Sequence, residues 1–178
     1  MFYLSKSCRI EFSSSFFFPI RTVDIIRSIN DEDYEKAQFL PSEWEQFTSR
    51  IPSLLRSEAN LRQSDASLYC SVIDDSIVDI LSPLETTTQI WERCEYLSPR
   101  FAAKFLPYRS LDNHLEFVLA IRNYEVDGFN RVYPTYSGIN LSHDELECLS
   151  EQKSNVQKKI NDLLHSTPKA SSILTGTE

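Results

Sequence analysis

Arginine and tyrosine alternate with apolar residues near residue 120, in a pattern that suits contact with nucleic acid. A strand over 115–126 places Arg122 and Tyr124 on one face and Leu119 and Ile121 on the other. Arginine pairs with phosphate oxygens, and tyrosine stacks on any base with about 1–3 kcal/mol per base. The apolar face is expected to pack on a helix, which leaves the opposite face for a single strand.

Other basic and aromatic residues surround this strand. Between Arg100 and Asn140 the chain has five basic and four acidic residues, a net of +1 in a chain of −8. An alternative remains open, in which the tyrosines are core or edge residues and the arginines are solvated. The predicted nucleic-acid contacts are Lys104, Arg109, Arg122, Tyr124, Phe129, Arg131, Tyr133 and Tyr136.

The overall charge argues against an indiscriminate binder of polyanions. The sequence has 18 Lys and Arg against 26 Asp and Glu, so a nucleic-acid site must be a local strip on an acidic body. In the first half, acidic residues lie among the basic ones. We therefore expect this half to serve pairing rather than contact with nucleic acid. The basic residues there are Arg9, Arg21, Arg27 and Lys36, and the acidic ones are Asp24, Asp31, Glu32, Asp33 and Glu35.

Catalysis finds no support in the sequence. Only three histidines occur, His114, His143 and His165, and the chain has no HExxH, nucleophile elbow or Walker loop. The acidic turns Asp74-Asp75 and 31–33 resemble ordinary solvated turns more than cation sites. No enzyme activity, cofactor or metal is therefore expected.

The cysteines predict an intracellular protein. Cys8, Cys70, Cys94 and Cys148 form no CxxC pair, so we expect reduced and mostly buried thiols. No apolar run reaches the length of a membrane span. We therefore expect a nuclear or cytoplasmic protein with no membrane partner.

The pattern of residues predicts strands followed by helices. Residues 2–29 are rich in strand formers, 30–33 form an acidic turn, and a helix begins near Pro41 and is interrupted near Pro52. Residues 115–126 form a strand, Asp127-Gly128 a hairpin turn, and 131–133 a short extended piece. Ser142 and Glu145 form a capping box for a helix that ends near His165.

These elements divide the chain into four parts. Residues 1–63 form a first, divergent strand–helix repeat, and 64–99 form a connecting segment with strands at 68–73 and 77–81. Residues 100–166 form the second repeat, and 167–178 form a disordered tail.

The two helix starts have matching apolar positions. The segments 39–47 and 141–149 place apolar residues at their first, sixth and ninth positions, Phe39, Trp44 and Phe47 against Leu141, Leu146 and Leu149. Either an internal duplication or two ordinary strand–loop–helix units would give this pattern.

The second half resembles the single-strand DNA-binding domain of the Positive Cofactor Four family of transcriptional coactivators. The residues that carry the resemblance are Val118 to Tyr124, Tyr133-Pro134-Thr135 and Gly138 to Ser142, and the first helix start from Phe39 to Phe47 matches as well. The resemblance covers about 105–164 well and about 9–55 loosely.

This resemblance implies an α+β fold of curved antiparallel sheets, each backed by a C-terminal helix. Family members pair as dimers and bind unpaired DNA in a channel made by the sheets. Two copies in one chain would form an intramolecular pseudo-dimer, and a homodimer is the other option. The lysine-rich turn of the family is here Thr135-Tyr136-Ser137, so weak binding is expected.

Two functional hypotheses follow. In the first, the chain is a non-enzymatic binder of single-stranded DNA or RNA with little sequence preference, acts as a transcriptional coactivator and contacts transcription proteins. In the second, it is a protein-interaction or assembly module with the same fold that has lost nucleic-acid binding. A continuous positive strip through Arg109, Arg122 and Arg131 would favour the first hypothesis.

Overall fold

The computed structural model describes residues 1–17, 20–63, 95–109, 111–112 and 114–165. Its centre is one antiparallel sheet with the strand order β1-β2-β3-β4-β8-β7-β6-β5. The first half contains β1 (Phe2–Tyr3), β2 (Cys8–Ser13), β3 (Thr22–Ser28), β4 (Tyr34–Phe39), α1 (Pro41–Ser49) and α2 (Ile51–Gln63). The second half contains β5 (Glu95–Ser98), β6 (Phe101–Arg109), β7 (Leu115–Val126), β8 (Val132–Ser142) and α4 (His143–His165).

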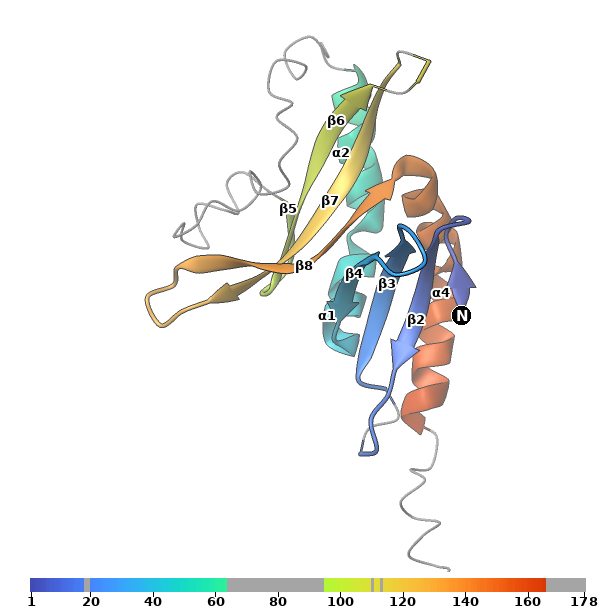
Figure 1. Ribbon diagram of the computed structural model, residues 1–178, viewed down its shortest axis with the longest axis vertical. Helices are drawn as coiled ribbons and strands as arrows, with labels where there is room; N and C mark the ends of the chain where they lie inside the picture. The colour runs from blue at the N-terminus through green and yellow to red at the C-terminus, as the bar shows by residue number, and fades with distance from the viewer. Residues whose placement is uncertain (18–19, 64–94, 110, 113, 166–178) are drawn as a thin grey trace, which may run out of the picture.

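The predicted α+β class, antiparallel sheet and C-terminal helix are confirmed. The described helices α1, α2 and α4 lie on one face of the sheet (Figure 1), and we call the side that no described helix covers the open face. The sequence suggested separate sheets, whereas β4 and β8 join the two halves into a single eight-stranded sheet.

Several predictions fall on residues outside the described ranges. These are the strands at 68–73 and 77–81, the Asp74-Asp75 turn, the rest of the connecting segment up to residue 94, Cys70, Cys94 and the tail 167–178. Of the connecting segment 64–99, the described part is 95–99, which contains β5.

Strands β4, β5 and β6 were not predicted, and β8 extends to Ser142, beyond the short piece expected at 131–133. The β4 sequence Tyr-Glu-Lys-Ala-Gln-Phe is polar and has few strand formers. The β6 strand contains Pro107, which cannot donate a ladder hydrogen bond. Pro107 is tolerated because β5 pairs only with residues 101–103, so this part of β6 has a described partner, β7, on one side.

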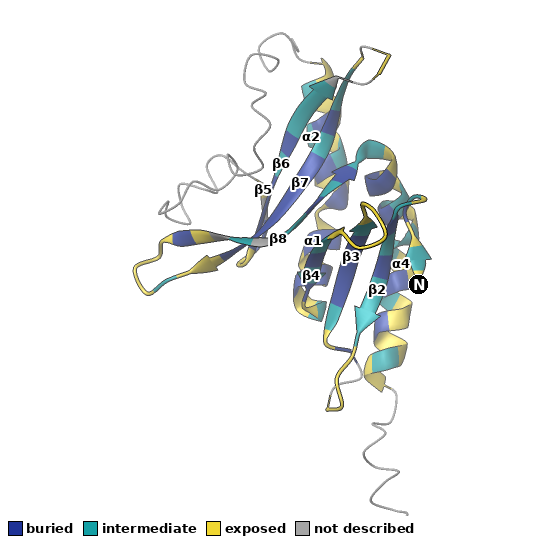
Figure 2. Ribbon diagram, in the orientation of Figure 1, coloured by how far each residue is buried: buried dark blue, intermediate teal, exposed yellow. Residues whose placement is uncertain are grey.

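The helix starts form the core as their spacing predicted. Phe39, Trp44, Phe47, Leu141, Leu146 and Leu149 are all buried in one hydrophobic cluster that includes residues of both halves. The Phe39 ring stacks on the Phe101 ring of β6 with centroids 4.4 Å apart. Burial alternates over the first residues of β2, where alternate side chains point toward the helices, whereas β3 and β7 have runs of buried residues on both faces (Figure 2).

The halves meet at equivalent positions. Lys36 of β4 pairs with Gly138 of β8, and these residues lie three positions before Phe39 and Leu141. Each half has four described strands in antiparallel succession before its helices.

A glutamate at each helix start contacts the other half of the chain. Glu43 of α1 accepts hydrogen bonds from Arg100 (2.5 and 2.9 Å) and a long one from Ser98 (3.4 Å). Glu145 of α4 accepts from Arg27 (2.5 Å) and Ser5 (2.8 Å).

Both glutamates also bond the backbone N–H three residues earlier, at Leu40 (2.9 Å) and Ser142 (3.0 Å). At Ser142 the predicted capping box is complete, because its hydroxyl accepts from the Glu145 N–H at 3.2 Å. Leu40 has no side-chain acceptor, so the first helix has half of this arrangement.

An irregularity in β7 begins a two-stranded arm that we define as residues 124–134. The pairing of β7 with β8 shifts between Arg122 and Tyr124. The Thr135 hydroxyl bonds both the backbone and side-chain oxygens of Asn123 (3.0 Å each), and the Asn123 amide donates to the Arg100 carbonyl (3.2 Å). These bonds fix the irregularity, which redirects the hairpin away from the helices (Figure 1).

The described cysteines are free thiols, as the sequence suggested. Cys8 is fully buried and Cys148 is half-buried. Burial, with a smaller contribution from the Glu145 carboxylate, raises the pKa of Cys8 to about 12. Cys8 is therefore protonated and unreactive at neutral pH.

Candidate nucleic-acid interface

Three basic side chains lie in one row across the open face. Arg9 pairs with Ile26, Ile26 with Lys36, Lys36 with Gly138, and Gly138 with Arg122. Residues directly opposite each other in neighbouring strands point to the same face. We call Arg9, Lys36 and Arg122 the basic row; successive members lie two strands apart, which is roughly 10 Å.

Arg122 is a buried cation without a carboxylate partner among the described residues. It is 7% exposed, and its Nη atoms donate to the carbonyls of Ile121 (2.6 Å) and Ile139 (3.1 Å) and to Asn140 Oδ1 (2.8 Å). Its Nε has no hydrogen-bond partner in the described structure. Burial lowers the pKa of Arg122 to about 10, against a smaller opposing effect of the Glu35 carboxylate, so the guanidinium is charged at neutral pH although it forms no ion pair among the described residues.

Gly138 provides the space in which Arg122 lies. A Cβ at position 138 would be 2.7 Å from Arg122 Cδ and 2.7 Å from the Ile121 carbonyl oxygen. These separations are shorter than van der Waals contact, so a side chain there would displace the arginine or the strand. The glycine of the Gly-Ile-x-Leu motif is therefore required by the packing of β7 against β8.

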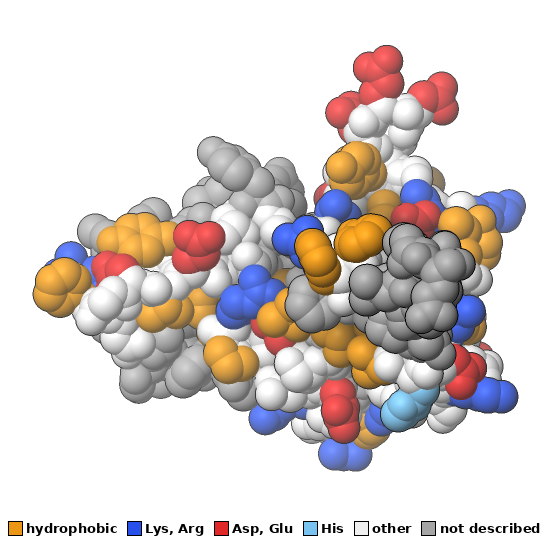
Figure 3. All heavy atoms as spheres, turned by 90° about the horizontal axis from the view of Figure 1, so that it is seen from below, with side chains coloured by type: hydrophobic (Ala, Val, Ile, Leu, Met, Phe, Trp, Pro, Cys, Tyr) orange, Lys and Arg blue, Asp and Glu red, His pale blue; other side chains and the backbone are white. Residues whose placement is uncertain are grey.

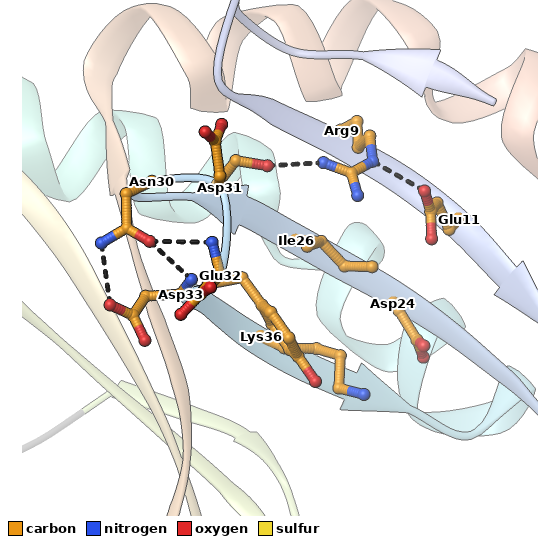
Figure 4. Close-up of a pocket in the computed structure, with 11 residues that line it drawn as sticks. Arg9, Glu11, Asp24, Ile26, Asn30, Asp31, Glu32, Asp33 and Lys36 are labelled. Atoms are coloured by element: carbon orange, nitrogen blue, oxygen red, sulfur yellow. Dashed lines mark hydrogen bonds and ion pairs between the residues drawn. The ribbon is translucent and has the colours of Figure 1, made fainter.

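The Arg9 end of the basic row opens into an acidic recess. This cavity of about 380 Å³ contains Arg9 and Lys36 and five carboxylates, those of Glu11, Asp24, Asp31, Glu32 and Asp33. Figure 4 shows the Arg9 side chain extending toward the side of the 30–33 turn, whereas the Lys36 amine points away from that turn, toward the side of Asp24. Arg9 bonds Glu11 (2.6 Å) and Ser28 (2.9 Å), whereas the Lys36 amine lies 5.6 Å from the Tyr34 ring centroid.

The positions of Arg122 and Tyr124 correct the sequence-based interpretation of β7. Leu119 and Ile121 pack in the main core, as predicted. Arg122 and Tyr124 are buried rather than exposed, and Tyr124 has no exposed surface. Tyr124 packs with Ala102, Ala120 and Val132 in a second small cluster on the open face, so it offers no stacking surface in this structure.

The tip of the arm brings three predicted contact residues together. Phe129 is 81% exposed, Tyr133 is exposed, and the Arg131 guanidinium lies 5.8 Å from the Phe129 ring centroid. Asp127 accepts hydrogen bonds from the N–H groups of Phe129 (2.8 Å) and Arg131 (2.9 Å) and from the Tyr133 hydroxyl (3.0 Å). These bonds hold an aromatic and basic tip in place.

The predicted Asp127-Gly128 hairpin turn lies where expected but has another geometry. The left-handed residue is Asn130, with φ 61°, and Gly128 has no positive φ. Asp127 closes the turn through its side chain, and Asn130 takes the conformation usually reserved for glycine.

The remaining predicted contacts do not form a continuous strip. Lys104 lies half-buried on β6, where its partner Ala120 places it on the open face. Arg109 pairs with Leu115 at the opposite end of β7 from the arm, roughly 35 Å away. The side chains of Arg109 and Tyr136 lie outside the description. Figure 3 shows basic and acidic side chains interspersed on the face that it displays.

Sequence reasoning missed Lys36 and Arg9 as members of the open face. One signal was available for Lys36, because the alignment of the helix starts makes it equivalent to Gly138 of the family-like motif. Arg9 could be placed only after the β2–β3–β4 register was known.

A separate cluster joins α4 to α2. His143 Nδ1 lies 2.8 Å from the buried Glu58 carboxylate, and Nε2 lies 3.2 Å from Glu147. His143, Asp144 and Glu147 form a group whose possible ligand atoms lie within 4.8 Å of one another. Both ring nitrogens have carboxylate partners, so the cluster is explained as a charge contact between helices.

This contact predicts a pH dependence of stability. The hydrogen bond to Glu58 raises the pKa of His143 above its usual 6.5. Because the folded pKa is raised, the stabilisation is full below pH 6.5 and declines as pH rises through the folded pKa. The effect should stay below about 1 kcal/mol, since the imidazole is partly solvated. Urea unfolding between pH 6 and 8 should show this decline in the native protein and lose it in His143→Gln.

Comparison of the chain with protein families, with curated proteins and with solved structures found no match. Among the described helices, none is long and apolar enough to cross a membrane.

Proposed function

We propose that the chain is a non-enzymatic single-stranded nucleic-acid-binding protein, and that it binds on the open face around Gly138. The observation that carries this proposal is Arg122, a buried guanidinium that forms no ion pair with a described carboxylate and whose Nε has no hydrogen-bond partner in the described structure. Such a burial is costly unless an anion balances it. Lys36 lies beside it across Gly138, so the two cations produce a positive potential that suits a phosphate.

The arm supplies the second kind of contact that a single strand needs. Phe129 and Tyr133 offer exposed rings on which bases can stack, and Arg131 adds positive charge. The basic row, Lys104 and Arg131 together give three to five phosphate contacts, according to how many the strand reaches. Because these contacts are to the backbone and to ring faces, we expect little sequence preference and no distinction between DNA and RNA.

We further propose that the two halves are a duplicated unit that forms a pseudo-dimer within one chain. Three observations support this: the matched helix starts, the pairing of Lys36 with Gly138, and the glutamate contacts at Glu43 and Glu145. The arrangement agrees with the resemblance to the Positive Cofactor Four family. A role as a nuclear transcriptional coactivator follows from that resemblance alone.

A protein-interaction or assembly module is the second candidate. The acidic recess favours it, because five carboxylates against two cations repel a polyanion. Under this alternative the open face would bind a protein with basic side chains, and single strands would not bind at any salt concentration.

Titration of labelled single-stranded oligonucleotides at several salt concentrations tests the proposal. Each neutralised phosphate contributes about −0.7 to the log–log salt slope for single strands. Three to five contacts predict a slope of roughly −2 to −3.5. If the native protein shows no binding even at low salt, the nucleic-acid proposal is wrong and the interaction module replaces it.

Arg122→Met separates binding from stability. We expect affinity to fall about tenfold at low salt and the slope to become shallower by about 0.7, because one cation is lost. The free energy of unfolding should stay unchanged or rise by up to about 3 kcal/mol, since a buried charge without a carboxylate partner is replaced by an apolar chain. Urea denaturation measures the second quantity.

Arg56→Met on α2 is the matched control. Arg56 is exposed and lies on the helix side, so the substitution changes net charge equally but should leave affinity within about twofold. Equal losses of affinity in the two variants would show that only net charge matters and would remove Arg122 from the site.

A further inference from the structure

The turn between β3 and β4 stands at the Arg9 end of the basic row. Asn30 Oδ1 accepts hydrogen bonds from the N–H groups of Glu32 (2.9 Å) and Asp33 (2.8 Å), and its Nδ2 donates to the Asp33 carboxylate (2.8 Å). The Ile29 N–H closes the turn on the Asp33 carbonyl at 2.9 Å. The turn therefore fixes three consecutive acidic residues in space.

These acidic residues share the recess with two members of the basic row. Asp31, Glu32 and Asp33 line the same cavity as Arg9 and Lys36 (Figure 4). No ion pair joins the turn to the row among the described residues, and Arg9 is paired with Glu11 instead. The carboxylates of Asp31 and Glu32 are exposed, so they repel any anion that approaches Arg9.

The corresponding hairpin of the second half has the opposite character. There the turn between β7 and β8 carries Phe129 and Arg131 at the end of a long arm. The open face thus has an acidic, short hairpin on one side of Gly138 and an aromatic, basic arm on the other. A dimer of two identical chains would have equal hairpins on both sides.

We propose that the 30–33 turn is an electrostatic boundary that confines a bound single strand to the second-half side of the open face. This inference rests on the proposed function. The strand is attracted by Arg122, Lys36 and the arm, and its path ends where the phosphates meet Asp31 and Glu32. Arg9 then lies beyond the end of the bound strand, because the two carboxylates keep the phosphates from reaching it.

The test is the double variant Asp31→Asn/Glu32→Gln, which removes two charges and retains the Asn30 and Asp33 hydrogen bonds. Fluorescent oligo-dT of about 8 and about 20 nucleotides spans the usual range of site sizes. At low salt we expect affinity for the longer oligonucleotide to rise about fivefold, which two unit charges some 8 Å from a phosphate would give. The shorter one should gain less than twofold, because it does not reach the turn.

Glu151→Gln/Asp162→Asn on α4 is the matched control. It changes net charge by the same amount on exposed positions of the helix side, and should change either affinity by less than twofold. The gain of the turn variant should vanish near 1 M salt, where screening acts over about 3 Å.

The outcomes separate the inference from the function. Binding by the native protein with equal gains in turn and control variants overturns the boundary and leaves the proposed function in place. Equal gains for short and long oligonucleotides also overturn it. If the native protein, the turn variant and the control variant all fail to bind, the proposed function is wrong, and the boundary proposal is then wrong as well.

Discussion

Replacing Gly138 by alanine is expected to lower the free energy of unfolding by about 2–3 kcal/mol. The added Cβ would lie 2.7 Å from both the Ile121 carbonyl oxygen and Arg122 Cδ. The backbone oxygen cannot move without disturbing the β7–β8 ladder, so the strain falls on the centre of the sheet. Displacement of Arg122 should also weaken binding of a single strand. Urea unfolding and oligonucleotide titration measure the two effects.

Gly128→Ala is the control for this prediction. Nothing lies within 4 Å of a Cβ at position 128, and the residue has no positive φ. The variant should therefore be within about 0.5 kcal/mol of the native protein. If Gly138→Ala were equally harmless, the close approach of Arg122 to β8 would not be a constraint.

Removing the Glu145 carboxylate should have an effect of similar size. The Glu145 side chain is 5% exposed, and its carboxylate accepts hydrogen bonds from Arg27, Ser5 and the Ser142 N–H. Burial alone would raise its pKa, but these hydrogen bonds outweigh burial and lower it. Glu145→Ala removes an acceptor from all three donors. Arg27 keeps its bond to the Asn140 carbonyl (2.7 Å) and its contact with Glu35 (3.7 Å), but its closest carboxylate is lost, and we expect a loss of about 3 kcal/mol.

Glu43→Ala provides the comparison on the other side of the molecule. Its partner Arg100 is 47% exposed, whereas Arg27 is 23% exposed, so Arg100 can be solvated when its partner is lost. The loss should be about 1–2 kcal/mol. An equal or smaller loss in Glu145→Ala would contradict the view that burial of the arginine sets the cost.

The pH dependence gives a second measure of Glu145. Because its folded pKa is lowered below the usual 4.5, its stabilisation is present above pH 4.5 and declines as pH falls through the folded value. The difference in free energy of unfolding between the native protein and Glu145→Ala should therefore narrow as the pH falls below 4.5, because the native protein then loses a contribution that the variant already lacks.

Local patterns in the sequence predicted the helices and the strand at 115–126. Helix starts depend on a few adjacent residues, and Trp44 and Leu146 follow the spacing that buries one side of a helix. The β4 and β6 strands depend on their neighbours in the sheet. Lys36 and Pro107 are unfavourable in isolated strands, and their positions became clear only from the register.

The candidate site was harder to predict for the same reason. Alternation correctly separated Leu119 and Ile121 from Arg122 and Tyr124, but it could not show that both faces are buried. The tip residues Phe129, Arg131 and Tyr133 were found because a turn is a local feature. The basic row combines residues from three strands, so it follows from tertiary structure alone.

The central strand pair also sets a condition on synthesis of the chain. Lys36 and Gly138 are about 100 residues apart in the chain. At a synthesis rate of about 5–20 residues per second, β8 is therefore made roughly 5–20 s after β4. During that time β4 is an unprotected sheet edge, which invites pairing with other nascent chains. Glu35 and Lys36 place charge on this edge, and charged side chains discourage such aggregation. The polar character that hid β4 in the sequence thus protects the first half until its partner emerges from the ribosome.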